Sequence, residues 1–162
     1  MTIIAHASKN WGIGKDNDLM FRLPQDMKFF RETTSGGVVI MGRKTLESFP
    51  NQKPLPNRVN IVITKNNDFT PDGVIVAHSA EEASNIAKEY NDRKVFVIGG
   101  AMIYDLMLPY CSKALITKVF ADSDADTFIH NFDADSDWEL FSQSDDIADN
   151  GYTIRFCEYR RK

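Results

Sequence analysis

Short runs of apolar and β-branched residues alternate with helical patterns along the first 120 residues of the chain. Several runs are apolar almost throughout, as expected of strands that are covered on both faces of a sheet. The clearest helical pattern is Ser79–Tyr90, which begins with a capping box formed by Ser79 and Glu82. Because alternating strands and helices require crossover connections, the pattern predicts a largely parallel sheet. The strand-like runs are Thr2–Ala5, Val38–Met41, Val59–Thr64, Val74–Ala77, Lys94–Ile98 and Ala114–Phe120.

The pattern changes after Phe120. Two strand candidates, Trp138–Ser144 and Tyr152–Tyr159, are joined by turn-forming residues with no helix between them, so the sheet should end antiparallel. We expect a single α/β domain over residues 1–162. It should have a predominantly parallel central sheet of about eight strands, an antiparallel C-terminal hairpin and about four flanking helices. Open α/β sheets bind their ligands in the loops at the carboxyl ends of the strands.

Charge and cysteine content narrow the class of partner. A net charge of -4 at pH 7 leaves no concentrated basic surface, so we expect no nucleic acid partner. Cys111 and Cys157 are far apart and form no CxxC pair, which favours reduced thiols in the cytoplasm. The N-terminus has no basic lead-in, and no apolar run is long enough to span a membrane. We expect a cytoplasmic monomer that binds small molecules and no membrane.

Two strand-to-helix turns carry signals for phosphate binding. In the first, the run Val38–Met41 ends at Gly42 and is followed by Arg43 and Lys44 at a helix start. Free N–H groups, the helix dipole and the two cations would all attract an anion there. In the second, a strand-like run ends at the pair Gly99–Gly100, which lets the backbone approach a pyrophosphate. Each turn alone is also compatible with an ordinary helix start. Two such turns in one predicted sheet together favour a nucleotide site.

A nucleotide kinase is one alternative, because the residues from Gly37 nearly spell a phosphate-binding loop. Arg43 interrupts the motif between Gly42 and Lys44, and Val38–Met41 looks like a strand where the motif needs a flexible loop.

A calcium-binding module is the alternative from another class, since Asp122–Asp126 resembles the opening of a calcium loop. Thr127 stands where that loop needs glycine, and Asp133 replaces its bidentate glutamate, so a surface turn is the better interpretation. The three histidines have no metal-ligand spacing, and we expect no metal.

Asp26 is the candidate catalytic carboxylate. Pro24 marks the start of a helix, which places Asp26 in its first turn with Met27 and Phe30 on the apolar stripe beside it. A carboxylate at this place is common for dipole reasons alone, but its apolar surroundings suggest a pocket.

Together these segments resemble dihydrofolate reductase of the bacterial type, in order and at the right separations over essentially the whole chain. The matching segments are Ile13–Lys15, Leu23–Asp26, Ile40–Thr45, Pro54–Asn60, Val97–Gly100 with Ile103–Tyr104, and Asp126–Phe128. The resemblance implies reduction of 7,8-dihydrofolate to 5,6,7,8-tetrahydrofolate, with hydride from NADPH to pterin C6 and a proton at N5. It also implies that antifolate inhibitors would bind.

The resemblance assigns a role to each site residue. Asp26 would hold the 2-amino group and N3 of the pterin, Thr117 would be its partner, and Phe21 would form the aromatic wall. The predicted substrate-binding residues are Ile4, Ala5, Met27, Phe30, Phe49, Arg58 and Ile98. Arg58 would clamp the α-carboxylate of the substrate, and Asp126 would latch a mobile loop around Gly14. The predicted cofactor-binding residues are His6, Ile13, Gly14, Gly42, Arg43, Lys44, Thr45, Thr64, Lys65, Gly99, Gly100, Ala101, Met102, Ile103 and Tyr104.

Several positions depart from the family pattern. Met20–Phe21 stands where proline and tryptophan are usual, so an indole N–H is lost, and Asn51–Lys53 lengthens the loop before Pro54. His6 occupies a strand position that usually carries a small residue and would affect the fit of the pterin or an antifolate. Met102 replaces a frequent arginine, which leaves recognition of the 2′-phosphate to Arg43, Lys44 and Lys65. A riboflavin-pathway pyrimidine reductase could share the sheet and the NADPH site, but Leu23–Asp26 and Pro54–Pro56 speak against it.

Overall fold

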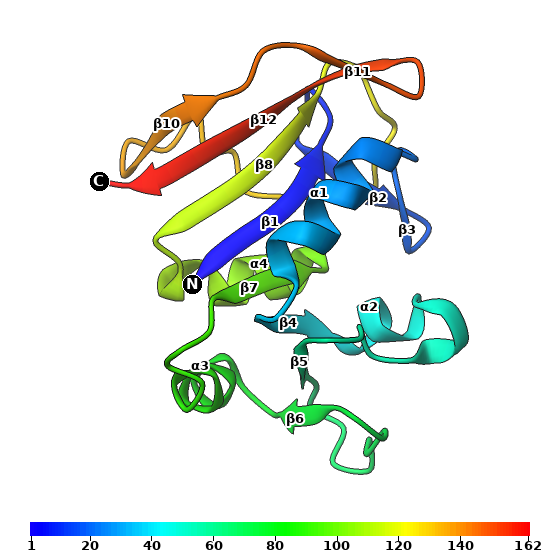
Figure 1. The fold of residues 1–162 in the computed structure, drawn as a ribbon, viewed down its shortest axis with the longest axis vertical. Coiled ribbons are helices and arrows are strands. Elements are labelled where there is room, and N and C mark those ends of the chain that lie inside the picture. Colours follow the sequence, from blue (N-terminus) through cyan, green and yellow to red (C-terminus); the bar gives the residue numbers. More distant parts are fainter.

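The computed structural model describes all residues, 1–162, and is built on one large sheet (Figure 1). Eight strands follow one another in the order β10-β12-β8-β1-β7-β4-β5-β6, and β11 pairs with β12 beside this path. All pairs from β8 through β1 to β6 are parallel, whereas β10, β11 and β12 are antiparallel to their neighbours. The strands are β1 (Thr2–Ala7), β4 (Val38–Gly42), β5 (Val59–Ile63), β6 (Ile75–Ala77), β7 (Val95–Gly99), β8 (Lys113–Val119), β10 (Trp138–Gln143), β11 (Ile147–Asp149) and β12 (Tyr152–Arg161). The predicted fold class is confirmed, and every predicted strand run falls on one of these strands.

A second, three-stranded sheet was not predicted. It has the order β3-β2-β9 and consists of β2 (Gly12–Lys15), β3 (Asp18–Leu19) and β9 (Thr127–Phe128). These strands are only two to four residues long, and β2 contains two glycines, so they are too short to show the apolar alternation that marks a strand. The small sheet joins the predicted mobile loop to the acidic turn before β9.

Four α-helices flank the large sheet: α1 (Pro24–Thr34), α2 (Arg43–Glu47), α3 (Ala80–Lys88) and α4 (Ala101–Met107). Single 3₁₀ turns follow at Pro50–Gln52 and Leu108–Tyr110. In Figure 1, α1 crosses in front of β1, and α4 lies behind the sheet. At the start of α3 the Ser79 hydroxyl accepts from the Glu82 amide at 3.0 Å, whereas the Glu82 carboxylate accepts from the His78 amide at 2.9 Å.

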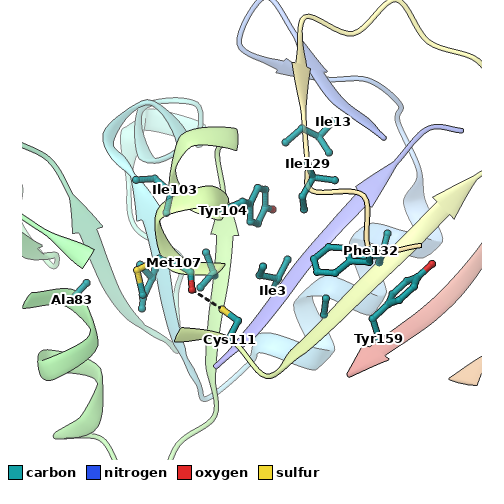
Figure 2. Close-up of a cluster of buried hydrophobic side chains, with 14 of the residues drawn as sticks. Ile3, Ile13, Ala83, Ile103, Tyr104, Met107, Cys111, Ile129, Phe132 and Tyr159 are labelled. Carbon is teal, nitrogen blue, oxygen red and sulfur yellow. Dashed lines mark hydrogen bonds between the residues drawn. The ribbon is translucent and has the colours of Figure 1, made fainter. Parts of the chain in front are cut away.

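The two faces of the sheet are packed by alternate residues of the same strands. Ile3 belongs to the largest cluster, which also holds buried side chains of α3 and α4 (Figure 2). Ile4 points to the other face, where it packs in a cluster with Val39 and Met41 against phenylalanines of α1. The longest helix, α1, has 11 residues, and no helix combines the length and apolar composition needed to cross a membrane.

Both cysteines are buried and free. Burial raises the pKa of the Cys111 thiol to about 11, and it also raises the pKa of Cys157. The Cys111 thiol donates to the Met107 carbonyl at 3.2 Å (Figure 2). The two thiols therefore act as small apolar core side chains.

Candidate active site

Many of the residues predicted to bind the cofactor lie at the carboxyl ends of three neighbouring parallel strands. β4 ends at Gly42, β7 ends at Gly99, and β5 ends at Ile63, directly before Thr64. In the sheet register Met41 pairs with Gly99, and Gly42 pairs with Ile63. The structure therefore brings the two predicted phosphate-binding turns side by side, at the edge where such sheets bind ligands.

Glycine allows these two turns to approach each other. A Cβ atom at Gly42 would lie 3.0 Å from Cγ1 of Ile103, and one at Gly100 would lie 3.9 Å from the Thr45 hydroxyl oxygen. Gly99 has a φ of 126°, a conformation that side-chain-bearing residues rarely adopt. Neither α2 nor α4 has a side-chain cap at its first turn. The N–H groups of these turns therefore have no side-chain hydrogen-bond partner.

Cations surround these turns. Arg43, Lys44 and Lys65 are exposed. The Nε atom of Arg43 lies 3.7 Å from Oε1 of Glu47, whereas Lys44 and Lys65 have no ion-pair partner. The remaining predicted residues of α4 differ in environment, because Ala101 is half-buried, Ile103 is buried and Met102 is 74% exposed.

His78 was not predicted at this end of the pocket. Its Nδ1 atom lies 2.7 Å from the Thr64 carbonyl oxygen, which places the imidazole beside a residue predicted to face phosphate. In the sequence it is a polar residue just before a helix cap, and such residues are usually surface residues without further contacts.

Asp26 is held at the opposite end of the same edge. It lies in the first turn of α1, and its side chain is buried, with 13% of its surface exposed. Its Oδ1 atom accepts a hydrogen bond from the Thr117 hydroxyl at 2.6 Å. Its Oδ2 atom lies 3.1 Å from Nδ1 of His6. The family resemblance gave Thr117 as the partner of Asp26, and the two side chains are in direct contact.

His6 therefore lies against the predicted catalytic carboxylate, whereas the sequence analysis grouped it with the cofactor-binding residues. The Cα partner of His6 on β8 is Thr117, so the two side chains that hold Asp26 come from neighbouring positions of adjacent strands. The sequence predicted that His6 lines the pocket, but it contains no signal for a contact with a residue 20 positions away on α1.

Asp149 is a second residue that sequence reasoning missed. Its buried carboxylate accepts hydrogen bonds from the amides of Gln25 and Asp26, at 3.0 and 3.2 Å. The N-cap position of α1 is Leu23, which cannot cap the helix with its side chain. A carboxylate from β11 therefore caps α1 and fixes the position of Asp26.

Most of the predicted apolar substrate residues share one cluster. Ile4 is buried in it, and Phe30, Phe49 and Ile98 are partly buried against it. Met27 is 47% exposed at the rim, and Ala5 packs its side chain against the cluster on the other face of the sheet. These positions give an apolar surface between the Asp26 end and the outer end near Arg58.

Arg58 is a cation fixed by hydrogen bonds and without an acidic partner. Its Nε donates to the Pro56 carbonyl at 2.9 Å, and its Nη1 donates to the Thr34 hydroxyl at 3.1 Å. Partial burial lowers the pKa of Arg58, and the nearby charge of Arg31 lowers it further. An anionic ligand would relieve both effects, because it would replace lost hydration and offset the repulsion.

Tyr104 links α4 to β1 beneath the site. Its hydroxyl donates to the Ile4 carbonyl at 2.8 Å. Burial raises the pKa of Tyr104, and the Asp26 carboxylate raises it further, so the phenol stays neutral at physiological pH. Ile13 and Tyr104 both belong to the large cluster of Figure 2, which connects the predicted mobile loop to the sheet.

Phe21 is buried in a third apolar cluster with Leu23. Its ring packs edge-on against Tyr152 at a centroid separation of 4.9 Å, and it lies 6.0 Å from the His6 ring. Phe21 therefore lies near His6, which contacts Asp26, and it offers no polar atom there.

The predicted loop contact involves the acidic turn. The backbone N–H of Asp126 donates to the Gly14 carbonyl, and Oδ2 of Asp126 accepts from the Asp16 amide at 2.9 Å. Asp124 forms an ion pair with Lys15. The acidic residues of this turn therefore bind the loop, and no group of them forms a metal-ion cluster. The kinase alternative also loses its basis, because Val38–Gly42 is strand β4 rather than a phosphate-wrapping loop.

Comparison with known proteins agrees with this geometry. The family model described as dihydrofolate reductase matches residues 1–161. The dihydrofolate reductase of Bacillus subtilis (strain 168) is 40% identical over 152 residues, which cover 93% of this chain and 88% of that protein. That of Staphylococcus haemolyticus is 36% identical over 165 residues, covering 99% and 95%.

A solved structure is also similar throughout. The dihydrofolate reductase from Enterococcus faecalis, complexed with NADP(H) and RAB-propyl, matches with a TM-score of 0.88 and 34% identity. The match covers 99% of this chain and 95% of that one. The family model, the relatives and the shared fold all agree, and we conclude that the chain belongs to the dihydrofolate reductase family.

Proposed function

We propose that the pterin of dihydrofolate binds at Asp26 and that NADPH lies across the carboxyl ends of β4, β5 and β7. As a member of its family, the chain reduces 7,8-dihydrofolate to 5,6,7,8-tetrahydrofolate with NADPH. NADPH supplies a hydride to pterin C6, and a proton is added at N5. The observation that carries the proposal is the buried Asp26 carboxylate, which two side chains hold at the ligand-binding edge of the sheet.

At the pterin, Asp26 acts as an acceptor. Each carboxylate oxygen has room for more than one hydrogen bond, so the contacts to Thr117 and His6 leave lone pairs for the 2-amino group and N3–H. Two parallel hydrogen bonds fix both the position and the plane of the ring. The negative charge also favours arrival of a proton on the bound ring. The apolar side chains of Phe30 and Ile98 exclude water from its faces.

At the outer end, Arg58 binds the α-carboxylate of the substrate. Its guanidinium already donates to Pro56 and Thr34, and the remaining N–H groups can receive an anion. No acidic side chain competes for it within ion-pair distance.

For the cofactor, the residues present fit a dinucleotide carrying an extra phosphate. Gly100 leaves open space beside the Thr45 hydroxyl, whereas a Cβ atom at Gly42 would crowd Ile103 of α4. Lys44 and Lys65 are cations without partners, and with Arg43 they favour NADPH over NADH because only NADPH carries the 2′-phosphate. Gly14 and its small sheet would close over the nicotinamide end, latched by Asp126.

Antifolate inhibitors with a ring that carries hydrogen-bond donors would bind at the Asp26 carboxylate.

The two free, buried thiols favour a reducing compartment, the cytoplasm.

We also propose that the enzyme is a monomer, because one chain supplies both ends of the pocket. Sedimentation equilibrium with and without NADPH tests this last point, and a dimer mass would contradict it.

The experiment follows the loss of NADPH absorbance when dihydrofolate is added to the purified protein. We expect Asp26→Asn to lower turnover at neutral pH about 10²-fold or more, because the ring loses a charged acceptor, while NADPH affinity stays within about twofold. Glu32→Gln is the matched control, since Glu32 is an exposed carboxylate on the same helix. No dihydrofolate-dependent loss of NADPH by the unmodified protein would refute the proposed function, and unchanged turnover of Asp26→Asn would remove Asp26 from it.

A further inference from the structure

His6 and Thr117 hold the two oxygens of one carboxylate. The two residues are Cα partners on adjacent parallel strands, so their side chains project to the same face of the sheet. Thr117 donates to Oδ1 of Asp26 at 2.6 Å, and Nδ1 of His6 lies 3.1 Å from Oδ2. The side chain of His6 is only 6% exposed, so water does not replace this contact easily.

The other nitrogen of His6 is buried without a partner. Nε2 of His6 and Nε1 of Trp138 are the two buried side-chain polar atoms that lack a hydrogen bond. The ring facing His6 is that of Phe21, which has no polar atom to offer. A buried polar atom without a partner is unfavourable, and an apolar side chain would fill the same space without this cost. The favourable interaction of the imidazole at this position is therefore its contact with Asp26, and not the filling of space in the core.

His6 is also the only basic side chain within ion-pair distance of Asp26. The other titratable groups at this place come from two elements. Tyr104 on α4 stays neutral and donates to the Ile4 carbonyl, and the Asp149 carboxylate on β11 accepts from two amides of α1. Asp26 therefore depends on His6 and Thr117 for its side-chain contacts, and no lysine or arginine pairs with it.

We propose that His6 is a positioning residue of the reduction, which holds the Asp26 carboxylate for the pterin. The inference rests on the proposed function. Neutral His6, with its proton on Nδ1, donates one hydrogen bond and adds no charge. Protonated His6 donates a charge-assisted bond and offsets the charge that favours proton arrival on the ring. In both protonation states the Nδ1–H group can therefore hold the carboxylate.

Two substitutions test the hold on Asp26. His6→Ala removes it, whereas His6→Asn places an amide near the position of Nδ1 that can still donate. For His6→Ala we expect the KM for dihydrofolate to rise about tenfold, the change expected when one hydrogen bond to a charged group is lost. For His6→Asn we expect a rise of about threefold or less, with the NADPH dissociation constant unchanged in both.

Recovery by His6→Asn is the readout that a merely structural role would not move, because an amide that can donate near the position of Nδ1 restores the hold on Asp26. His130→Ala is the matched control, because His130 also pairs with an aspartate, Asp135, at 2.9 Å but away from the site. A KM for dihydrofolate that does not rise in His6→Ala would overturn the proposal, as would an equal rise in His6→Asn or in His130→Ala.

A second measurement tests the contact without activity. In ¹⁵N NMR spectra of the three imidazoles, Asp26→Asn should shift the His6 signals and leave those of His78 and His130 in place. An unmoved His6 signal would overturn the pairing. Failure of the proposed function is distinguishable from failure of this inference, since only the former abolishes dihydrofolate-dependent NADPH oxidation by the unmodified protein.

Discussion

Asp149 connects the stability of α1 with the geometry of the site, which makes Asp149→Ala an informative perturbation. The carboxylate is 3% exposed and accepts from the amides of Gln25 and Asp26 at 3.0 and 3.2 Å. No other hydrogen-bond acceptor serves these two amides, and Leu23 at the N-cap offers none. The substitution therefore leaves two donors at the helix start without a protein partner.

The magnitude follows from these two bonds. Loss of a hydrogen bond to a charged group costs about 1.5–3 kcal/mol, and loss of a helix N-cap costs about 0.5–2 kcal/mol. Water entering the vacated space recovers part of the loss, so we expect Asp149→Ala to lower the free energy of unfolding by about 2–4 kcal/mol. At about 2–4 °C per kcal/mol for a chain of this size, the Tm should fall by about 4–16 °C. Asp149→Asn keeps an oxygen acceptor without the charge and should lose about half as much.

Urea denaturation measures the free energy of unfolding, and initial rates measure the KM for dihydrofolate. Because the first turn of α1 carries Asp26, the KM for dihydrofolate should rise in Asp149→Ala at temperatures where the variant is fully folded. Ser79→Ala is the matched control, since it removes the N-cap of α3 at a distance from the pocket and should cost about 1 kcal/mol with unchanged kinetics. A stability loss below about 0.5 kcal/mol, or kinetics equal to those of Ser79→Ala, would refute the role of Asp149.

Two further predictions concern the charged ends of the pocket. Replacing Arg43 and Lys44 together by Gln should weaken NADPH binding about tenfold or more and NADH binding little, as measured by fluorescence titration; equal losses for both cofactors would contradict a 2′-phosphate contact. Arg58→Gln should raise the KM for dihydrofolate about ten- to hundredfold but leave that for a pterin substrate without the carboxylates unchanged, and an equal rise for both substrates would argue against the clamp.

The strands of the large sheet could be predicted because their local pattern matches their environment. Runs such as Val38–Met41 are apolar throughout since the sheet is covered on both faces, and each of those four residues is buried. The start of α3 was equally clear, because Ser79 caps a helix within the next three residues. The small sheet could not be predicted, since Gly12–Lys15 has no apolar stripe of its own. One of its two partner strands is only Asp18–Leu19, and the other, Thr127–Phe128, lies more than 100 positions away.

Site residues could be predicted where they belong to one motif of adjacent residues. The turns at Gly42 and Gly99 were found because strand, glycine and helix start are adjacent in sequence. The residues around Asp26 were not, because His6, Thr117 and Asp149 reach it from three different strands. The family resemblance supplied Thr117, but His6 departs from the family pattern and Asp149 lies 124 and 123 residues from the two amides it caps. Such contacts depend on how α1 lies over the sheet, which no pattern within one segment encodes.

The capping of α1 by Asp149 has a consequence for synthesis of the chain. Asp149 belongs to β11, which pairs with β12, and β12 in turn pairs with β8, the strand that carries Thr117. During translation, Asp26 emerges long before these partners, and the carboxylate cannot adopt its final setting until the last hairpin has left the ribosome and docked. A nascent or truncated chain ending before residue 149 should therefore be unable to reduce its substrate even if most of the sheet has formed. Full activity should appear only with the closing strands, late in folding, as expected when contacts join the two ends of a sequence.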